Sequence, residues 1–442
     1  ISAIDTVNIE TGTNNTTISE ATGKTANVDA EALADGNLLS TSGAGSFSVT
    51  NLLADMTNTA TGTVEVWLDD DGAAGATTTI TNNAAITLQL HNDFTSNDVI
   101  STAGTGSFNV IGLKADLVNS ATGTVLATMA HTETSDVINV TNNALTGTLT
   151  IANGTFVDGD TLNIDGAGTV NVTGLVADVY ASNQTGELNV ISVDDVSIIT
   201  GSSNVQVTSN VSAKTAAVNA DQMADGTTLS TSGSGNLTIT NLTANLTNTA
   251  TGTNTVTLRD DAPGVGVVDT TITSSTTITV NNGSFDYNDL INLAGAGAKT
   301  LNSVMADVNA AGSTGTVNIA STGDATDNAI SVTTGSAATS VNGNAASDTI
   351  SINAEDLAGR PRLERRTHRE DAEVRPNVPD HITGFDEHAG HDQQVVRALV
   401  KAWIEHAKVS ARRHQNRKPA EVRRQTLPEA NRLRSRPWPS EL

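Results

Sequence analysis

Apolar residues alternate with small polar residues in short runs along most of the chain. One such set of alternating apolar positions comprises Phe47, Val49, Val64, Val66, Leu68, Ile80, Ile86, Leu88 and Leu90. Alternation with a period of two predicts β-strands that bury one face. The breaks between the runs are rich in Gly, Asn, Asp and Thr, which is typical of turns. The pattern therefore predicts an all-β fold.

The alternating runs belong to a longer repeat, and each copy of it contains a Gly-x-Gly pair. These pairs are Gly43/Gly45, Gly104/Gly106, Gly166/Gly168, Gly233/Gly235 and Gly295/Gly297. Successive pairs recur at a period of about 62 residues, with the longest interval between Gly166 and Gly233. Three strand–turn segments of roughly twenty residues fit into each copy, and such segments bury their apolar faces only by stacking on neighbours. We therefore predict a parallel β-helix-like solenoid of about five copies.

The apolar positions of the copies line up in columns. The columns are Leu39, Ile100, Leu162, Leu229 and Ile291; Val49, Val110, Val172, Ile239 and Leu301; and Leu52, Leu113, Leu175, Leu242 and Val304. A column that begins with Phe47 and Phe108 ends at Lys299, which departs from the pattern. Such columns argue against disorder, because a disordered segment has no inward face. A string of β-sandwiches would need about 100 residues per domain, more than one copy supplies.

Charge divides the chain into two parts. Residues 1–359 contain five Lys or Arg against 36 Asp or Glu, a balance of −31, whereas residues 360–442 contain 18 against 12, a balance of +6. The acidic part would repel nucleic acid and anionic membrane surfaces. Cysteine is absent, which excludes a disulfide framework, and no apolar run approaches the length of a membrane span.

We accordingly predict a solenoid over residues 1–358 and a basic, Pro-rich tail over residues 359–442. The repeat stops abruptly there, which indicates a foreign or frame-shifted segment, disordered apart from one amphipathic helix over residues 392–414. The alternative for the tail is a nucleic-acid-binding segment that uses its arginines, among them Arg412, Arg413 and Arg423.

Adjacent carboxylates recur after the Thr-Gly-Thr turn or its variant in three copies, whereas the second copy has His131-Thr132 and the fifth keeps only Asp324. The adjacent carboxylates are Asp70 and Asp71, Asp194 and Asp195, and Asp260 and Asp261. Calcium prefers six to eight oxygen ligands, and loops rich in Asp and Asn can supply them. These six residues are our candidate Ca²⁺ ligands. The alternative is that Asp simply suits turns and solvated edges.

A second acidic column follows the sequence Leu-x-Ala or its variants. It consists of Asp55, Asp116, Asp178, Asn245 and Asp307. A binding stripe along the solenoid is one interpretation. We favour the other, in which each side chain is a turn device that satisfies backbone donors.

The stretch Gly343-Asn344-Ala345-Ala346-Ser347-Asp348-Thr349-Ile350 resembles a degenerate form of the GGxGxDxUx nonapeptide of RTX proteins. In style and composition, residues 1–358 are similar to repetitive bacterial surface or secreted proteins, including RTX-type adhesins. This resemblance implies an extracellular or cell-surface location and calcium binding. The chain begins at Ile1 without Met or a signal peptide, so we expect an internal piece of a longer parent protein.

The expected function is a structural or adhesive segment of a bacterial extracellular repeat protein, stabilised by calcium. Its expected partners are cell-surface or matrix components, polysaccharide among them, and neighbouring repeats of the parent chain. We do not expect an enzyme, because His91 and His131 lie in different copies and cations are scarce. The alternative is a carbohydrate-active β-helix lyase or glycosidase. That enzyme would gather polar and charged residues on one face, whereas an array repeats its surface evenly.

Overall fold

The computed structural model describes residues 1–70, 75–92, 98–130, 135–260, 268–322, 329–343 and 349–356. Within these residues the protein is all-β, with 36 strands and no helix. The predicted tail over residues 359–442, its helix over 392–414, most of the nonapeptide-like stretch, Asp71 and Asp261 lie outside the described residues.

The strands form two sheets that the chain visits alternately. The first sheet contains β1 (Ser2–Ala3), β3 (Thr16–Glu20), β5 (Leu38–Gly43), β7 (Asp55–Asn58), β9 (Thr77–Asn82), β11 (Val99–Ala103), β13 (Asp116–Asn119), β15 (Val137–Asn142), β17 (Thr161–Gly166), β19 (Asp178–Tyr180), β21 (Val196–Ile199), β23 (Thr215–Asn219), β25 (Asn236–Leu242), β27 (Asn254–Leu258), β29 (Ile278–Asn281), β31 (Lys299–Val304), β33 (Val317–Ser321) and β35 (Thr339–Gly343). The second sheet contains β2 (Val7–Glu10), β4 (Thr25–Asp29), β6 (Ser46–Leu52), β8 (Val64–Leu68), β10 (Thr87–His91), β12 (Ser107–Leu113), β14 (Val125–Met129), β16 (Leu149–Ala152), β18 (Val170–Leu175), β20 (Leu188–Ser192), β22 (Val205–Ser209), β24 (Thr228–Gly233), β26 (Asn245–Asn248), β28 (Asp269–Ser274), β30 (Leu290–Gly295), β32 (Asp307–Ser313), β34 (Ala329–Thr333) and β36 (Thr349–Asn353).

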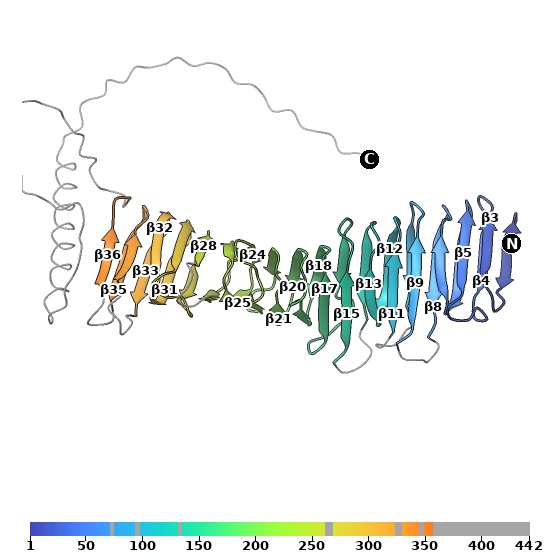
Figure 1. Ribbon diagram of the computed structural model, residues 1–442, viewed down its shortest axis with the longest axis horizontal. Helices are drawn as coiled ribbons and strands as arrows, with labels where there is room; N and C mark the ends of the chain where they lie inside the picture. The colour runs from blue at the N-terminus through green and yellow to red at the C-terminus, as the bar shows by residue number, and fades with distance from the viewer. Residues whose placement is uncertain are drawn as a thin grey trace, which may run out of the picture. The chain divides into compact units, whose positions relative to one another are not determined.

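Each strand pairs in parallel with the strand two further along the chain, so one coil consists of two strands (Figure 1). Phe47 on β6 lies opposite Val64 on β8, and Val66 on β8 lies opposite Leu90 on β10. The predicted β-solenoid is confirmed, and each predicted strand–turn segment is one coil that contains two strands. Interior strands use both edges, which explains why the repetitive part almost lacks proline.

The apolar columns form one continuous core between the sheets. Val49, Val110 and Val172 are buried on β6, β12 and β18 of the second sheet, as predicted. The next two members of the column, Ile239 and Leu301, are buried on β25 and β31 of the first sheet. The copies therefore share one core but change sheets part of the way along it.

The change of sheets arises in the third copy, between Gly166 and Gly233. This interval contains seven strands, β17 to β23, whereas the other intervals between the glycine pairs contain six. The connections are shorter in the third copy: three residues separate β20 from β21, but eight separate β8 from β9. An odd number of strands advances the chain by half a coil, so the last two copies turn at the opposite edge.

Glycine marks the corner where consecutive coils stack closely. Gly43 has a φ of 96°, a conformation that glycine adopts without a steric penalty. A Cβ added to Gly62 would lie 2.3 Å from the carbonyl oxygen of Gly45 in the preceding coil. The same distance recurs between Gly123 and Gly106, so the corner requires glycine in successive coils.

Buried polar side chains line the glycine corner in the first, second and fourth copies. The Thr41 hydroxyl donates to Asn58 Oδ1 at 2.8 Å, and Asn58 Nδ2 donates to Asn82 Oδ1 at 2.9 Å. Thr102 and Asn119, and Thr231 and Asn248, form the same pair at 2.8 Å. Pairing satisfies groups whose burial would otherwise be costly.

The third and fifth copies replace this pair by apolar residues, Ile164 with Ala181 and Leu293 with Ala310. A different side chain then donates to the second glycine of the pair. Gln184 Nε2 donates to the Gly168 carbonyl at 2.6 Å, and Lys299 Nζ donates to the Gly297 carbonyl at 2.8 Å.

Lys299 explains the departure seen in the Phe47 column. Its side chain is fully buried, and its ammonium also donates to the Gly295 carbonyl at 2.9 Å and to Ser313 Oγ at 3.2 Å. Burial lowers the pKa of Lys299 from its ordinary value of 10.5.

Candidate functional site

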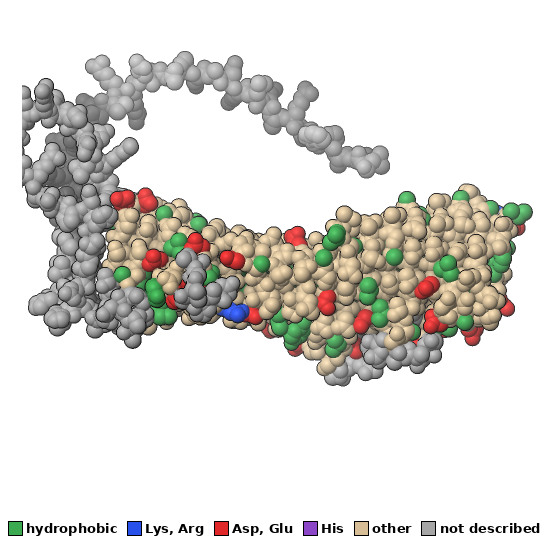
Figure 2. Space-filling view, in the orientation of Figure 1, with side chains coloured by type: hydrophobic (Ala, Val, Ile, Leu, Met, Phe, Trp, Pro, Cys, Tyr) green, Lys and Arg blue, Asp and Glu red, His purple; other side chains and the backbone are tan. Residues whose placement is uncertain are grey.

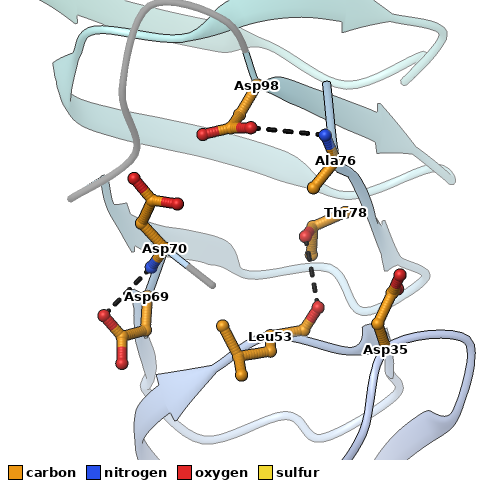
Figure 3. Close-up of a pocket in the computed structure, with 7 residues that line it drawn as sticks. All are labelled: Asp35, Leu53, Asp69, Asp70, Ala76, Thr78 and Asp98. Atoms are coloured by element: carbon orange, nitrogen blue, oxygen red, sulfur yellow. Dashed lines mark hydrogen bonds between the residues drawn. The ribbon is translucent and has the colours of Figure 1, made fainter. Parts of the chain in front are cut away.

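Two adjoining depressions occupy one edge of the first copy and share Asp69. The smaller is lined by Asp35, Leu53, Asp69, Asp70, Ala76, Thr78 and Asp98 (Figure 3). The larger, of about 420 Å³, is lined by Thr50, Asn51, Trp67, Leu68, Asp69, His91 and Asn92. Together they form the candidate functional site.

The smaller depression, which we call the acidic pocket, receives its carboxylates from separate loops. Asp35 lies between β4 and β5, Asp69 and Asp70 follow β8, and Asp98 precedes β11. Consecutive coils turn at the same edge of the solenoid, so residues distant in sequence meet there. In Figure 3 the carboxylates of Asp70 and Asp98 lie on the side of the pocket away from Asp35.

The carboxylates of the acidic pocket bind backbone groups. Asp98, which is 1% exposed, accepts a hydrogen bond from the Ala76 amide at 3.3 Å, and Asp69 accepts one from the Asp70 amide at 3.0 Å. The equivalents of Asp98 in other copies behave alike. Asp160 accepts from the Asp136 amide at 2.9 Å, and Asp289 accepts from the Val268 amide at 3.0 Å. These buried aspartates hold the connecting loops in place.

In the fourth copy the buried aspartate of this kind, Asp289, lies near other carboxylates, which disfavours its charged form. Burial raises the pKa of Asp289, and the nearby charges of Asp260 and Asp286 raise it further. Asp260, one of our candidate calcium ligands, is 5% exposed, and its amide donates to Ser284 Oγ at 2.9 Å. The fourth copy therefore concentrates carboxylates in the loops equivalent to those that form the acidic pocket of the first copy.

Asp194 and Asp195, the candidate calcium ligands of the third copy, have a protein cation between them. Lys214, one coil further on, forms ion pairs with Asp194 and, at 3.1 Å, with Asp195. The hydrogen bond from Lys214 lowers the pKa of Asp194, and hydrogen bonds from the Thr215 amide and from Lys214 lower that of Asp195.

The four candidate calcium ligands that the structure describes thus lie in different settings. Asp70 lines the acidic pocket, Asp194 and Asp195 bind a lysine, and Asp260 is buried. Across the described residues, no three His or carboxylate side chains are arranged to hold a metal ion. Calcium binding stays a prediction.

The second acidic column has the structural role that we favoured. Each member accepts a hydrogen bond from a backbone amide in the next coil, at 2.7 to 2.9 Å. The pairs are Asp55 with Thr79, Asp116 with Asn139, Asp178 with Ser197, Asn245 with Thr271 and Asp307 with Ser331. The prediction that these side chains satisfy backbone donors is confirmed. They begin strands and bind donors in the next coil, however, and do not act within a turn.

The larger depression, which we call the aromatic hollow, contains an ordered stack of rings. Trp67 on β8 and His91 on β10 lie opposite each other in adjacent strands. Their ring centroids are 4.6 Å apart and their planes differ by 6°. Glu65 Oε1 lies 2.9 Å from His91 Nε2 and fixes the imidazole from the side.

Sequence reasoning missed the aromatic hollow. It considered His91 only as a catalytic base, whereas the alternation also places Trp67 and His91 on the outward face, opposite Val66 and Leu90 in the core. The sequence did contain a signal for the hollow. Trp67 occupies an outward position at which the second and fourth copies have Thr128 and Thr257.

The fold makes the chain a β-solenoid repeat protein. No family model, no curated protein and no solved structure matches it. The described residues include no helix that could cross a membrane.

Proposed function

We propose that this solenoid is a structural and adhesive segment of a bacterial extracellular repeat protein. The observation that supports the proposal is the outward surface, on which coil after coil presents small polar side chains. Amides of adjacent strands pair along it at 2.6 to 3.1 Å: Asn8 with Asn27, Gln89 with Asn109, Asn139 with Asn163, Asn171 with Asn189, Asn281 with Asn302, and Asn292 with Asn309.

Such rows of amide side chains can make many weak contacts with a partner along the length of the solenoid. Carboxylates are scattered over the face shown in Figure 2, where polar side chains and backbone predominate. Each amide both donates and accepts, as do the hydroxyl groups of polysaccharides. Many weak contacts that engage together give avidity far above the affinity of any one of them. The proposed partners are therefore cell-surface or matrix components, polysaccharide among them.

Adhesion is tested with the full chain attached to beads at increasing density and passed over films of neutral polysaccharide, matrix glycoprotein or bare support. We expect retention on a biological film to rise more steeply than bead density. A chain that lacks residues 104–165, one whole copy, is the matched control and should lose more retention than its share of the repeats, because the weak contacts act together.

Two outcomes contradict the proposal. The first is retention on the biological films no greater than on the bare support at the highest density. The second is release of reducing ends from a soluble polysaccharide, which favours the carbohydrate-active enzyme. The tail-mediated alternative predicts retention on immobilised DNA that is lost when residues 360–442 are removed.

A further inference from the structure

We propose that the aromatic hollow of the first copy binds a neutral saccharide, with Trp67 as the stacking surface. This site deepens the adhesive part of the proposed function and rests on it for its biological role. Its chemistry is argued independently, from the residues that line the hollow. The hollow is also the one place on the described surface where a tryptophan interrupts the repeated polar rows.

The hollow has the dimensions of a ligand site. Its volume of about 420 Å³ falls in the range of about 300–1,000 Å³ typical of small-molecule pockets. It combines one large aromatic surface with a few polar groups, and in such sites the apolar surface provides contact area while the polar groups fix the orientation of the ligand. Thr50, Asn51 and Asn92 supply the hydroxyl and amide groups, and Asp69 supplies a carboxylate.

Trp67 is held in a fixed orientation before any ligand arrives. His91 stacks parallel to it at 4.6 Å, and Glu65 holds His91 at 2.9 Å. A ring supported on one side loses little freedom when a ligand covers more of it, and such preorganisation favours affinity. The three residues lie on two adjacent strands whose inward neighbours, Val66 and Leu90, are fully buried.

The polar rim is also preorganised. Asn51 has a φ of 56°, and its Nδ2 donates to Asp29 Oδ1 at 3.0 Å. The Thr50 hydroxyl donates to the Val28 carbonyl at 3.4 Å, and Asn92 Nδ2 donates to the Gly112 carbonyl at 3.3 Å. Each contact fixes the orientation of a polar side chain that lines the hollow.

These features together favour a saccharide. A pyranose ring has an apolar C–H face that can lie on an indole and a rim of hydroxyl groups that both donate and accept. Trp67 matches the face, and the amide and carboxylate groups match the rim. The strongly acidic solenoid disfavours polyanionic glycans, so the ligand is neutral.

A cationic peptide is the competing ligand, because an ammonium group also binds the face of an indole. The hollow disfavours it, since Asp69 is the single carboxylate among the described residues that line it and Glu65 already engages His91. A cation would find more carboxylates in the adjoining acidic pocket, whose described lining includes no aromatic ring.

The test uses the full chain with Trp403→Phe and Trp438→Phe, so that Trp67 is the only tryptophan. Cellohexaose, chitohexaose and mannohexaose are titrated by tryptophan emission and by calorimetry, with hexalysine as the competing probe. We expect at least one hexasaccharide to bind saturably and to shift the emission of Trp67. By calorimetry, Trp67→Ala should weaken binding at least tenfold, about 1.4 kcal/mol.

Further variants separate recognition from folding. Trp67→Phe keeps a flat ring and should retain part of the affinity, whereas His91→Ala should weaken binding about threefold by loosening Trp67. Thr128→Ala changes the same outward row further along the solenoid and should have no effect. Circular dichroism confirms that each variant is folded.

The proposal is overturned if no hexasaccharide binds, if Trp67→Ala binds as tightly as the parent, or if only hexalysine binds. Beads that still adhere while soluble hexasaccharides do not bind would overturn this site and leave the proposed adhesive function standing. Hexasaccharide binding in solution without retention of the beads would overturn the adhesive function and leave the saccharide site standing.

Discussion

The glycine corners of the first and fifth copies share a Gly-x-Gly pair but differ in the side chains that they bury. In the first copy Phe47 is apolar, and Thr41 and Asn58 form a buried hydrogen-bonded pair. In the fifth copy that pair is replaced by Leu293 and Ala310, and Lys299 in the phenylalanine position donates to the corner carbonyls. Two different sets of residues therefore occupy the corner beside the Gly-x-Gly pair.

Placing one corner residue of the fifth copy in the first copy should have the largest effect on the free energy of unfolding. Phe47→Lys places an ammonium in a corner where Thr41 and Asn58 already bind each other, and an uncompensated buried charge costs about 3–5 kcal/mol. The control is Phe47→Leu, the residue that the fourth copy has as Leu237, with an expected cost of about 1–2 kcal/mol. Urea unfolding and amide exchange in β5 to β8 measure both. Similar values for the two variants would show that the first corner accepts a cation as readily as the fifth.

Breaking the polar pair of the second copy should cost somewhat less. Asn119→Ala removes the partner of Thr102, of Asn142 and of the Ala121 amide, an expected loss of about 2–3 kcal/mol. Thr102→Ile together with Asn119→Ala recreates the apolar pair of the third copy. Its cost should fall below the sum of the single costs by about 1–2 kcal/mol. Additive costs in this double-mutant cycle would contradict the coupling.

The buried Lys299 should make stability depend on alkaline pH. Because burial lowers its pKa in the folded protein below 10.5, the unfolded chain binds more protons between the two values. The free energy of unfolding should therefore rise as pH increases through that interval. Lys299→Met removes this dependence, so the difference between parent and variant in urea unfolding at successive pH values isolates it. A difference that is constant with pH would mean that the amine is not titrating.

The acidic column predicts a smaller effect that separates charge from hydrogen bonding. Asp307 Oδ1 accepts from the Ser331 amide at 2.7 Å, and the fourth copy uses Asn245 at the equivalent place. Asp307→Asn should therefore change stability by less than about 0.5 kcal/mol, whereas Asp307→Ala should cost about 1 kcal/mol. A large loss in Asp307→Asn would show that the negative charge itself is needed.

The smallest effects should come from the adjacent carboxylates that we predict to bind calcium. Calcium at constant ionic strength should raise the melting temperature more than magnesium, and Asp70→Asn with Asp71→Asn should reduce that rise. Asp194 and Asp195 should respond to calcium only after Lys214→Met removes their lysine. Equal melting curves in calcium and magnesium would indicate general screening instead.

The same pairs give a test at low pH. The pKa values of Asp194 and Asp195 are lowered by their hydrogen bonds, so their contribution is present above the ordinary value of 3.8. It is lost as pH falls through the lowered values. Lys214→Met should diminish this acid-dependent loss in a thermal melt, and an unchanged profile would contradict the ion pair.

The sequence by itself determined the β-solenoid, its repeat length and its core. Alternation places Val49 and its equivalents on one face of a strand, and the repeat stacks those faces because a single coil cannot bury them. The role of the acidic column as an acceptor for backbone donors was also predictable, because short polar side chains often bind backbone amides, whereas its place at strand starts was not.

Only the tertiary structure decided which residues of the neighbouring coils each side chain contacts. Loop lengths that differ by a few residues set the number of strands per copy, and the odd strand of the third copy moved its successors to the other edge. The hollow around Trp67 and the cation between Asp194 and Asp195 depend on contacts with the neighbouring coil, which a whole turn of the chain separates in sequence. Local periodicity specifies the face of a strand on which a side chain lies, whereas the length of every intervening loop sets its neighbour across the coils.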